Sequence, residues 1–216
     1  MTTLSALIEI VETIIQDTSL ESLIPTFLNQ GQLEIAGGMD SAFGDFITPP
    51  LPKLLTIGTV ATATDAAYVA MPTTFQRDLV FAAGSNNVGI DIGNSWVEFM
   101  ESNPLLTRSG SIYEVIEQGD NLYYQGIPTT SETVTVHFYR KPVDMSGDDD
   151  TPDGVPDQLQ IPLLVNYVCR ELFSMIEDGT EGPQVNTLKH TALFQKALRT
   201  LEMSIPSDTR SLIVGS

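Results

Sequence analysis

A cysteine and a histidine in the C-terminal third of the sequence are the pair whose side chains suit nucleophilic catalysis. If two helices form a hairpin centred near Thr180–Glu181, residue 169 stands opposite about residue 192, which would bring His190 near Cys169. A reactive thiolate needs an electropositive and partly open site. Cys169 instead lies in a helix whose apolar positions include Val168 and Leu172, so we predict a buried structural cysteine.

Six aspartates crowd into the segment Asp144–Asp157 and raise the question of a calcium site. Four residues match positions 1, 3, 5 and 6 of an EF-hand loop, but position 12 is Gln160 and two prolines interrupt the loop. A strand, rather than a helix, is expected before it. We therefore favour a solvated linker that caps the following helix and keep a calcium-stabilised loop as the alternative. The matching residues are Asp149, Thr151, Asp153 and Gly154.

The other motifs give no basis for an enzyme. The segment Gly84–Gly89 lacks the lysine and the glycine pattern of a phosphate loop, and the sequence has no G-x-S-x-G, H-E-x-x-H or C-x-x-C motif. His137 stands alone on a predicted strand, where we expect a surface or packed residue rather than a ligand. The sequence thus predicts neither catalysis nor a bound cofactor or metal.

The charge balance is strongly acidic. Ten Lys and Arg residues stand against 28 Asp and Glu, which gives a net charge of −18, and Lys53 is the only cation in the first 76 residues. This balance disfavours binding to a nucleic-acid backbone, although the wall of a DNA conduit need not bind DNA. A single cysteine precludes an internal disulfide. The N-terminus lacks the features of a signal peptide and no apolar run approaches ~18 residues, so we expect a soluble protein without a membrane span that is not secreted.

Helical patterns occupy the first 37 residues. Apolar residues from Leu4 to Ile15 recur at the spacing of one helical face, after a threonine that can cap the helix. Thr18–Glu21 has the form of a capping box that opens a short turn. Pro25 suits the first turn of a further helix, which Gly37-Gly38 ends.

The C-terminal third is also helical. Apolar periodicity predicts one helix from Leu159 to about Asp178 and another from Val185 to Ser204. The loop between them is short enough for a helical hairpin. We expect these helices to pack against the N-terminal ones as a single bundle.

The middle of the sequence predicts antiparallel sheet. Ile112–Gln118 and Asn121–Gln125 flank a two-residue Gly-Asp loop, which is a hairpin signal. Glu132–Tyr139 alternates, with Val134, Val136 and Phe138 on one face. The strands are expected to form either one curled sheet or a small sandwich. Further strands are expected at 56–64, 66–71, 79–83 and 88–92, with a short helix at 96–101.

The predicted fold is therefore α+β, a helical bundle of N- and C-terminal helices with an inserted antiparallel β region. Residues 1–54 and 157–204 would form the bundle and residues 55–142 the β-rich insertion. Residues 143–156 would form the acidic loop. Residues 205–216 are too short to build a core of their own and are expected to be a docking tail.

Two segments are candidates for binding partner proteins. Between residues 184 and 203, Lys189, Lys196 and Arg199 outnumber the single acid, Glu202. They form either a solvated helix face or a docking face for an acidic neighbour, such as the Asp-rich loop of an adjacent copy. The tail carries Arg210 and the apolar residues Leu212, Ile213 and Val214, which suit addition to another chain's sheet or groove.

Short segments along nearly the whole chain resemble the head-to-tail adaptor proteins of short-tailed bacteriophages, the phage adaptor protein family. The order of elements is shared as well: helices, a hairpin at Tyr113–Tyr124, a strand, an Asp/Pro-rich loop and a helix. The segments that carry the resemblance are Leu23–Leu28, Gln32–Ile35, Met71–Arg77, Val134–Pro142 and Leu163–Glu177, which includes Tyr167–Leu172.

The resemblance implies a structural virion protein that is not an enzyme. It would form a dodecameric ring between the portal protein and the tail nozzle protein, with the C-terminal segment inserted on the portal side. Double-stranded DNA would pass through the ring without specific binding. The protein would lie at the head–tail interface of the virion, after assembly in the host cytoplasm.

Two other functions remain open from the sequence. One is another neck component or a minor capsid protein, which would share the logic of ordered assembly but have other partners. The other is a β-rich ligand-binding module with a calcium-stabilised loop, in which Trp96, Tyr123 and Tyr124 would form a stacking platform. These aromatic residues are more simply interpreted as packing for a small sheet.

Overall fold

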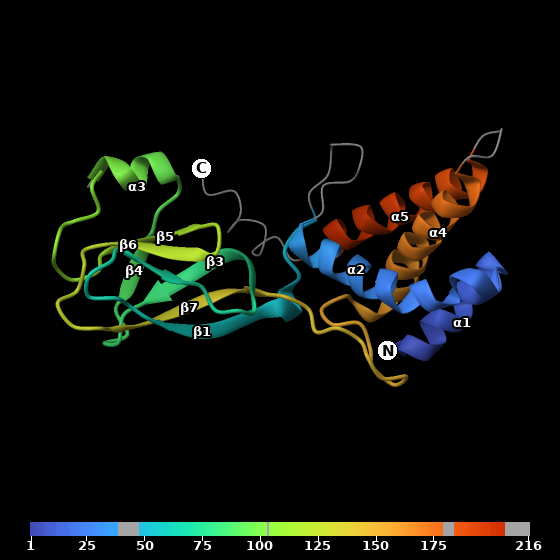
Figure 1. The fold of residues 1–216 in the computed structure, drawn as a ribbon, viewed down its shortest axis with the longest axis horizontal. Coiled ribbons are helices and arrows are strands. Elements are labelled where there is room, and N and C mark those ends of the chain that lie inside the picture. Colours follow the sequence, from blue (N-terminus) through green and yellow to red (C-terminus); the bar gives the residue numbers. More distant parts are fainter. Residues whose placement is uncertain (39–47, 103, 179–183, 206–216) are drawn as a thin grey trace. The chain divides into compact units, whose positions relative to one another are not determined.

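The computed structural model describes residues 1–38, 48–102, 104–178 and 184–205, which form two compact units (Figure 1). The helical unit comprises residues 1–38, 48–54, 142–178 and 184–205. The β unit comprises residues 55–102 and 104–141. The α+β class is confirmed, because helices from both ends of the chain pack together and a mostly antiparallel sheet is inserted between them in the sequence.

The N-terminal helices form close to where the sequence predicts them. Thr3 caps the first helix, because its Oγ1 accepts the N–H of Ala6 at 3.3 Å. The expected capping box at Thr18 is wrong in detail. Asp17 is the cap of that turn, and its carboxylate accepts the N–H of Ser19 at 3.0 Å. The three segments are α1 (Leu4–Ile15), the 3-10 helix η1 (Thr18–Leu23) and α2 (Ile24–Gly37).

The helix expected from Leu159 to Asp178 is divided near its start. Pro162 has no N–H to donate, so a regular α-helical ladder cannot run through it. The Asn166 backbone N–H bonds the Leu163 carbonyl, and the Asn166 side chain donates to the Pro162 carbonyl at 2.8 Å. The segments are the 3-10 helices η2 (Pro52–Leu54) and η3 (Asp157–Leu159), the π-helical turn η4 (Ile161–Val165), α4 (Asn166–Glu177) and α5 (Val185–Ser204).

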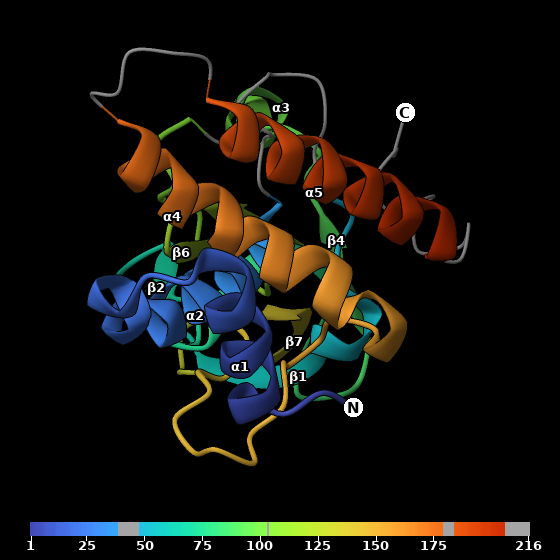
Figure 2. The same ribbon diagram turned by 90° about the vertical axis from the view of Figure 1, so that its right-hand side faces the viewer.

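Helix α4 is the centre of the helical unit. It lies between α5 on one side and α1 and α2 on the other, and it contacts all three (Figure 2). Gly31 of α2 permits a close approach, since a Cβ there would stand 2.8 Å from the Tyr167 ring. The core side chains come from all four helices, so each helix depends on the others for burial. They include Leu7, Val11, Leu28, Ile35, Tyr167, Leu172, Phe194 and Leu198.

The β unit is one seven-stranded sheet with the order β1-β7-β3-β4-β5-β6-β2. All neighbouring strands are antiparallel except β4 and β5. The edge strands β1 and β2 contact each other, so the sheet is curled and a separate sandwich is not formed. The elements are β1 (Leu55–Ala61), β2 (Tyr68–Ala70), β3 (Phe75–Ala83), β4 (Gly89–Ile92), α3 (Trp96–Ser102), β5 (Glu114–Gln118), β6 (Asn121–Gln125) and β7 (Thr133–Arg140).

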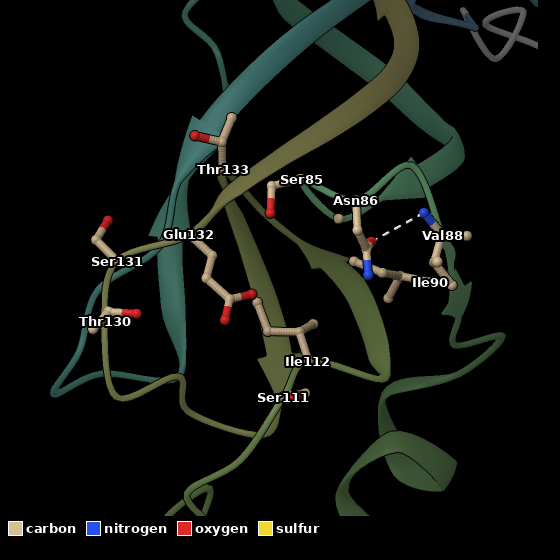
Figure 3. A pocket seen from close by; sticks show the side chains of 12 residues that line it. Ser85, Asn86, Val88, Ile90, Ser111, Ile112, Thr130, Ser131, Glu132 and Thr133 are labelled. Atoms are coloured by element: carbon tan, nitrogen blue, oxygen red, sulfur yellow. Dashed lines mark hydrogen bonds between the residues drawn. The ribbon is translucent and has the colours of Figure 1, made fainter.

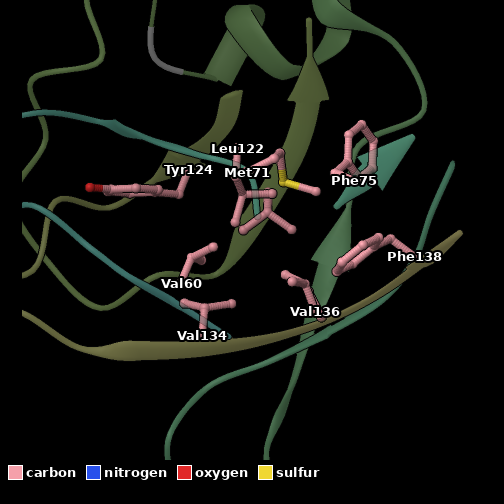
Figure 4. Packing of buried hydrophobic residues seen from close by; sticks show 10 residues of the cluster. Val60, Met71, Phe75, Leu122, Tyr124, Val134, Val136 and Phe138 are labelled. Atoms are coloured by element: carbon pink, nitrogen blue, oxygen red, sulfur yellow. The ribbon is translucent and has the colours of Figure 1, made fainter. Parts of the chain in front are cut away.

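The curled sheet encloses its own apolar core (Figure 4). The alternation predicted for β7 is confirmed, because Val134, Val136 and Phe138 are buried. Tyr124 of β6 is buried beside them, and its hydroxyl donates to the Ala66 carbonyl at 2.7 Å. The β unit therefore satisfies both the apolar and the polar parts of its largest core residue.

Strand boundaries depart from the predictions where the backbone is irregular. Strand β3 begins at Phe75 rather than at residue 79. Its first half pairs with β7 through several register shifts and Asp78 has a φ of 53°, so this half lacks a regular alternation in the sequence. Strand β5 begins at Glu114 rather than at residue 112. The hairpin turn is confirmed, and Gly119 supplies its positive φ of 61°.

Candidate partner-binding surface

Three of the four candidate partner-binding cations lie on α5. Lys189, Lys196 and Arg199 are exposed there. The tail residues Arg210 and Leu212–Val214 lie outside the described residues. Of the candidate partner-binding residues, only those on α5 are among the described residues, so the candidate surface is the surface of α5.

The inner face of α5 fixes which side of the helix points outward. Phe194 packs edge-on against Tyr167 of α4, with the ring centroids 5.6 Å apart, and the Arg170 guanidinium lies over both rings. Arg170 is itself ion-paired with Glu171. Since the buried residues recur every three or four positions, the opposite face is turned away from α4. The buried residues are His190, Phe194, Ala197, Leu198 and Leu201.

The start of α5 is fixed by a carboxylate from the end of α4. Glu177 accepts the N–H groups of Asn186 at 3.0 Å and of Thr187 at 3.1 Å, and the Thr187 hydroxyl at 2.7 Å. A carboxylate at this place satisfies N–H groups that have no partner within the helix. Desolvation opposes the charge, but the hydrogen bonds from Thr187 and Asn186 outweigh it and lower the pKa of Glu177.

The solvent-facing side of α5 combines apolar and cationic side chains. Val185, Leu188 and Met203 are 60%, 58% and 71% exposed. Within the part of the chain that the structure describes, none of the three cations beside them forms an ion pair. We call this set the α5 outer face. It consists of Val185, Leu188, Lys189, Lys196, Arg199 and Met203.

The net charge of α5 is opposite in sign to that of the whole protein. The helix carries three cations and one acid, a net charge of +2, in a protein of net charge −18. A shallow hollow beside it is lined by Leu188, Thr191, Ala192 and Gln195. Apolar side chains grouped with one sign of charge on an exposed helix are typical of a protein-binding face.

Cys169 and His190 have separate environments. Cys169 is fully buried, and burial raises the pKa of its thiol to about 12, so the prediction of a buried structural cysteine is confirmed. His190 stacks on Phe173 with ring centroids 5.4 Å apart, and its Nδ1 bonds the Asn166 Oδ1 at 2.9 Å. Burial, and then the nearby Lys189, lower the pKa of His190. Both side chains are therefore packed residues of the helical unit.

The acidic loop is tied to α2 by two polar side chains. Asn29 donates to the Met145 carbonyl at 3.0 Å and accepts the Met145 N–H at 2.8 Å. Gln32, which is fully buried, donates to the Val143 carbonyl at 2.9 Å and accepts the Asp153 N–H at 3.2 Å. These four bonds fix the course of the loop along α2.

The same loop caps α1 with its main chain. The N–H groups of Leu4 and Ser5 donate to the carbonyls of Asp150, at 2.7 Å, and Asp148, at 3.1 Å. Backbone N–H groups of Gly147 and Ser146 donate to the Asp150 carboxylate and lower its pKa. The Asp153 carboxylate likewise accepts a main-chain N–H. Among the described residues, no group of three His, Cys, Asp or Glu side chains is placed to hold a metal ion.

The β unit has a hollow of about 730 Å³ between the β3–β4 turn and the loop before β7 (Figure 3). Its lining is mostly small and polar, and the Glu132 side chain points into it. Asn86 turns its side-chain oxygen to the Val88 N–H at 3.1 Å. Glu132 is the one titratable side chain among the described lining residues, so the hollow offers no acid–base pair for catalysis.

The aromatic platform considered for ligand binding is not formed by the three residues proposed. Trp96 and Tyr123 do pack together, with ring centroids 4.9 Å apart. Tyr124, the next residue of β6, points to the opposite face of the sheet and is fully buried. Tyr68, which is half exposed, extends the pair at 5.4 Å from Tyr123. Packing of the sheet thus accounts for Tyr124.

Sequence reasoning missed the anchoring of the acidic loop. Asn29 and Gln32 lie at helical positions between the apolar residues Leu28 and Ile35, and polar side chains in the phase of a buried face require partners. That pattern was visible in the sequence, but it did not reveal that the partner would be a segment more than 110 residues away.

Comparison with known proteins identifies a family. The SU10 adaptor protein family matches residues 2–214, which is nearly the whole chain. A search of curated proteins gives no match. In the described residues, no helix combines the length and the apolar character needed to cross a membrane.

Proposed function

Because the chain belongs to the SU10 adaptor protein family, whose members are phage adaptor proteins, we propose that it is a head-to-tail adaptor. Copies would form a dodecameric ring between the portal protein and the tail nozzle protein, and double-stranded DNA would pass through the ring. The protein would assemble in the host cytoplasm and reside at the head–tail interface of the virion. The observation that carries this proposal is the family match along nearly the whole chain.

The helical unit supports a role in assembly. It has a complete core of its own, yet the α5 outer face leaves three large apolar side chains and three cations exposed. A ring of identical subunits covers such a face on every copy. The strongly acidic balance suits the proposed conduit, since acidic walls repel phosphates and leave DNA free to move.

We assign portal docking to the tail on the basis of its sequence. Leu212–Val214 is an apolar run next to Arg210, and it suits insertion into a groove or sheet of another chain. The tail would gain its partner only when the portal supplies one. This assignment gives the adaptor two kinds of contact, one with its own copies and one with the portal.

The adaptor proposal is tested by measuring mass during size-exclusion chromatography, with and without the portal protein of the same phage. We expect a monomer or weak oligomer alone and a ring of copies on the portal. Removal of residues 206–216 should abolish capture of the protein by the portal, and the helical unit should still unfold in the same transition as in the full-length protein. A matched variant of full length, with Leu212, Ile213 and Val214 each changed to Ser, should behave in the same way.

The other outcomes of this experiment separate the competing functions. Capture by the nozzle protein but not by the portal would place the chain elsewhere in the neck and overturn the adaptor assignment. Tight calcium binding that is lost in Asp153→Ala would favour the ligand-binding module instead. Capture by the portal that survives removal of the tail would overturn the docking role of Leu212–Val214 and leave the adaptor assignment intact.

A further inference from the structure

The two sides of the helical unit differ sharply in charge. Helices α5 and α1 lie on opposite sides of α4, and both views of the ribbon show this arrangement (Figures 1 and 2). The α5 outer face carries Lys189, Lys196 and Arg199. Residues 1–38, which include α1, contain no lysine or arginine.

The side of α1 that faces away from α4 is acidic. The buried residues of α1 include Leu7 and Val11, so Glu9 lies on the opposite side of that helix and is exposed, with Glu12 partly exposed next to it. Exposed aspartates of the acidic loop extend this charge at the N-terminal end of α1, because the loop carbonyls cap that end. We call this set the α1 acidic face. It consists of Glu9, Glu12, Asp148, Asp149 and Asp150.

We propose that the α5 outer face of one copy packs against the α1 acidic face of the next copy. This contact rests on the proposed ring, and it specifies which two surfaces of the helical unit meet. Cations then lie opposite carboxylates at every junction. The apolar residues Leu188 and Met203 gain cover from the neighbouring copy, where Ile8, partly exposed, lies one helical turn before Glu12 on α1.

The placement of the two faces determines the kind of assembly. Two different, complementary faces on opposite sides of one unit give a heterologous contact, which repeats from copy to copy and can close into a ring. Pairing of two α5 outer faces would instead bring Lys196 and Arg199 of both copies together and would stop at a dimer. Like charges at such a contact are unfavourable.

Other occupants of the α5 outer face fit less well. A DNA backbone would find three cations there, but the exposed side chains of Val185, Leu188 and Met203 would remain uncovered or lie against phosphates. A neighbouring copy supplies both acids and apolar surface. The charge contrast between the two sides of the unit therefore selects a second copy of this chain.

Charge exchange tests the contact. Lys196→Glu with Arg199→Glu should weaken the association of copies on the portal by about tenfold, and Glu9→Lys with Glu12→Lys should do the same. Combining the four substitutions in one chain should restore association, because every junction then regains opposite charges. Raising the salt concentration should weaken the wild type and the restored variant alike.

A matched control separates local pairing from net charge. Arg108→Glu with Lys141→Glu makes the same change in net charge on exposed residues of the β unit, and it should leave ring formation unchanged. If this control weakens the ring as much as the α5 substitutions do, or if the four-fold exchange fails to restore association, the proposed contact is wrong.

Cross-linking identifies the neighbours directly. Lys196→Cys and Glu9→Cys proteins, mixed on the portal and oxidised briefly, should give a disulfide-linked pair that neither variant forms alone. The native Cys169 is buried and should not interfere. Lys196→Cys dimers would show pairing of α5 with α5 and overturn the proposal. Rings on the portal without the mixed pair would overturn it too while leaving the adaptor role intact, whereas failure of the wild type to associate with the portal would overturn both.

Discussion

Helices α4 and α5 are consecutive in the sequence, yet α4 lies at the centre of the helical unit and α5 at one side of it. Helix α4 has neighbours on opposite sides, and Tyr167, Val168, Cys169 and Leu172 are all buried. Among the described helices, α5 makes its main contacts with α4 and the adjoining turn η4. The core of the helical unit is therefore complete without the α5 outer face, and that face is left for contacts with other molecules.

The inner side of α5 should dominate the stability of the helical unit. Phe194→Ala removes a fully buried ring that packs on Tyr167, and we expect a loss of about 3–5 kcal/mol in the free energy of unfolding. Urea denaturation followed by circular dichroism measures this loss. The neighbouring Leu193→Ala, at a site 41% exposed, serves as the control and should cost about 1 kcal/mol or less. Equal losses would contradict the division of α5 into two faces.

The close contact between α2 and α4 should tolerate no added atom. In Gly31→Ala the new Cβ would stand 2.8 Å from the Tyr167 ring, so the ring or a helix must shift. Overpacking outweighs the better helix propensity of alanine, and we expect a net loss of about 1–2 kcal/mol in the free energy of unfolding. Thermal denaturation provides the measurement. Gln30→Ala, on the exposed side of the same turn, should have little effect, and a stabilised Gly31→Ala protein would disprove the tight contact.

The cap between α4 and α5 should make the start of α5 sensitive to acid. The folded pKa of Glu177 lies below its ordinary value, so the cap contributes above the ordinary pKa of a glutamate and is lost as the pH falls through the lowered value. Hydrogen exchange at the N–H groups of Asn186 and Thr187 reports this change. Glu177→Gln should exchange faster than the wild type at neutral pH and respond less to acid. Identical exchange in the two proteins would mean that the carboxylate does not hold the helix start.

The sequence contained enough information for the periodic elements and for much of the candidate surface. The apolar spacing predicted α1, α5 and the alternation of β7, and it placed Cys169 in the core. The division of the helix at Pro162 was missed because apolar periodicity continues through η4. The bulged start of β3 was missed because its irregular pairing depends on a distant strand. The α5 cations were identified from charge alone, but the apolar part of the α5 outer face emerged only when the inner face was known.

The smallest effect on the folded monomer should come from the α5 outer face itself. Leu188→Ser with Met203→Ser removes apolar surface that already faces solvent, so we expect the free energy of unfolding to change by about 0.5 kcal/mol or less. The same protein should form fewer rings on the portal, because these side chains lose their cover at each junction. Urea denaturation and chromatography with mass measurement give the two results. A loss of about 2 kcal/mol in the monomer would show that the face packs within the chain, and the contrast between α4 and α5 would then have no bearing on assembly.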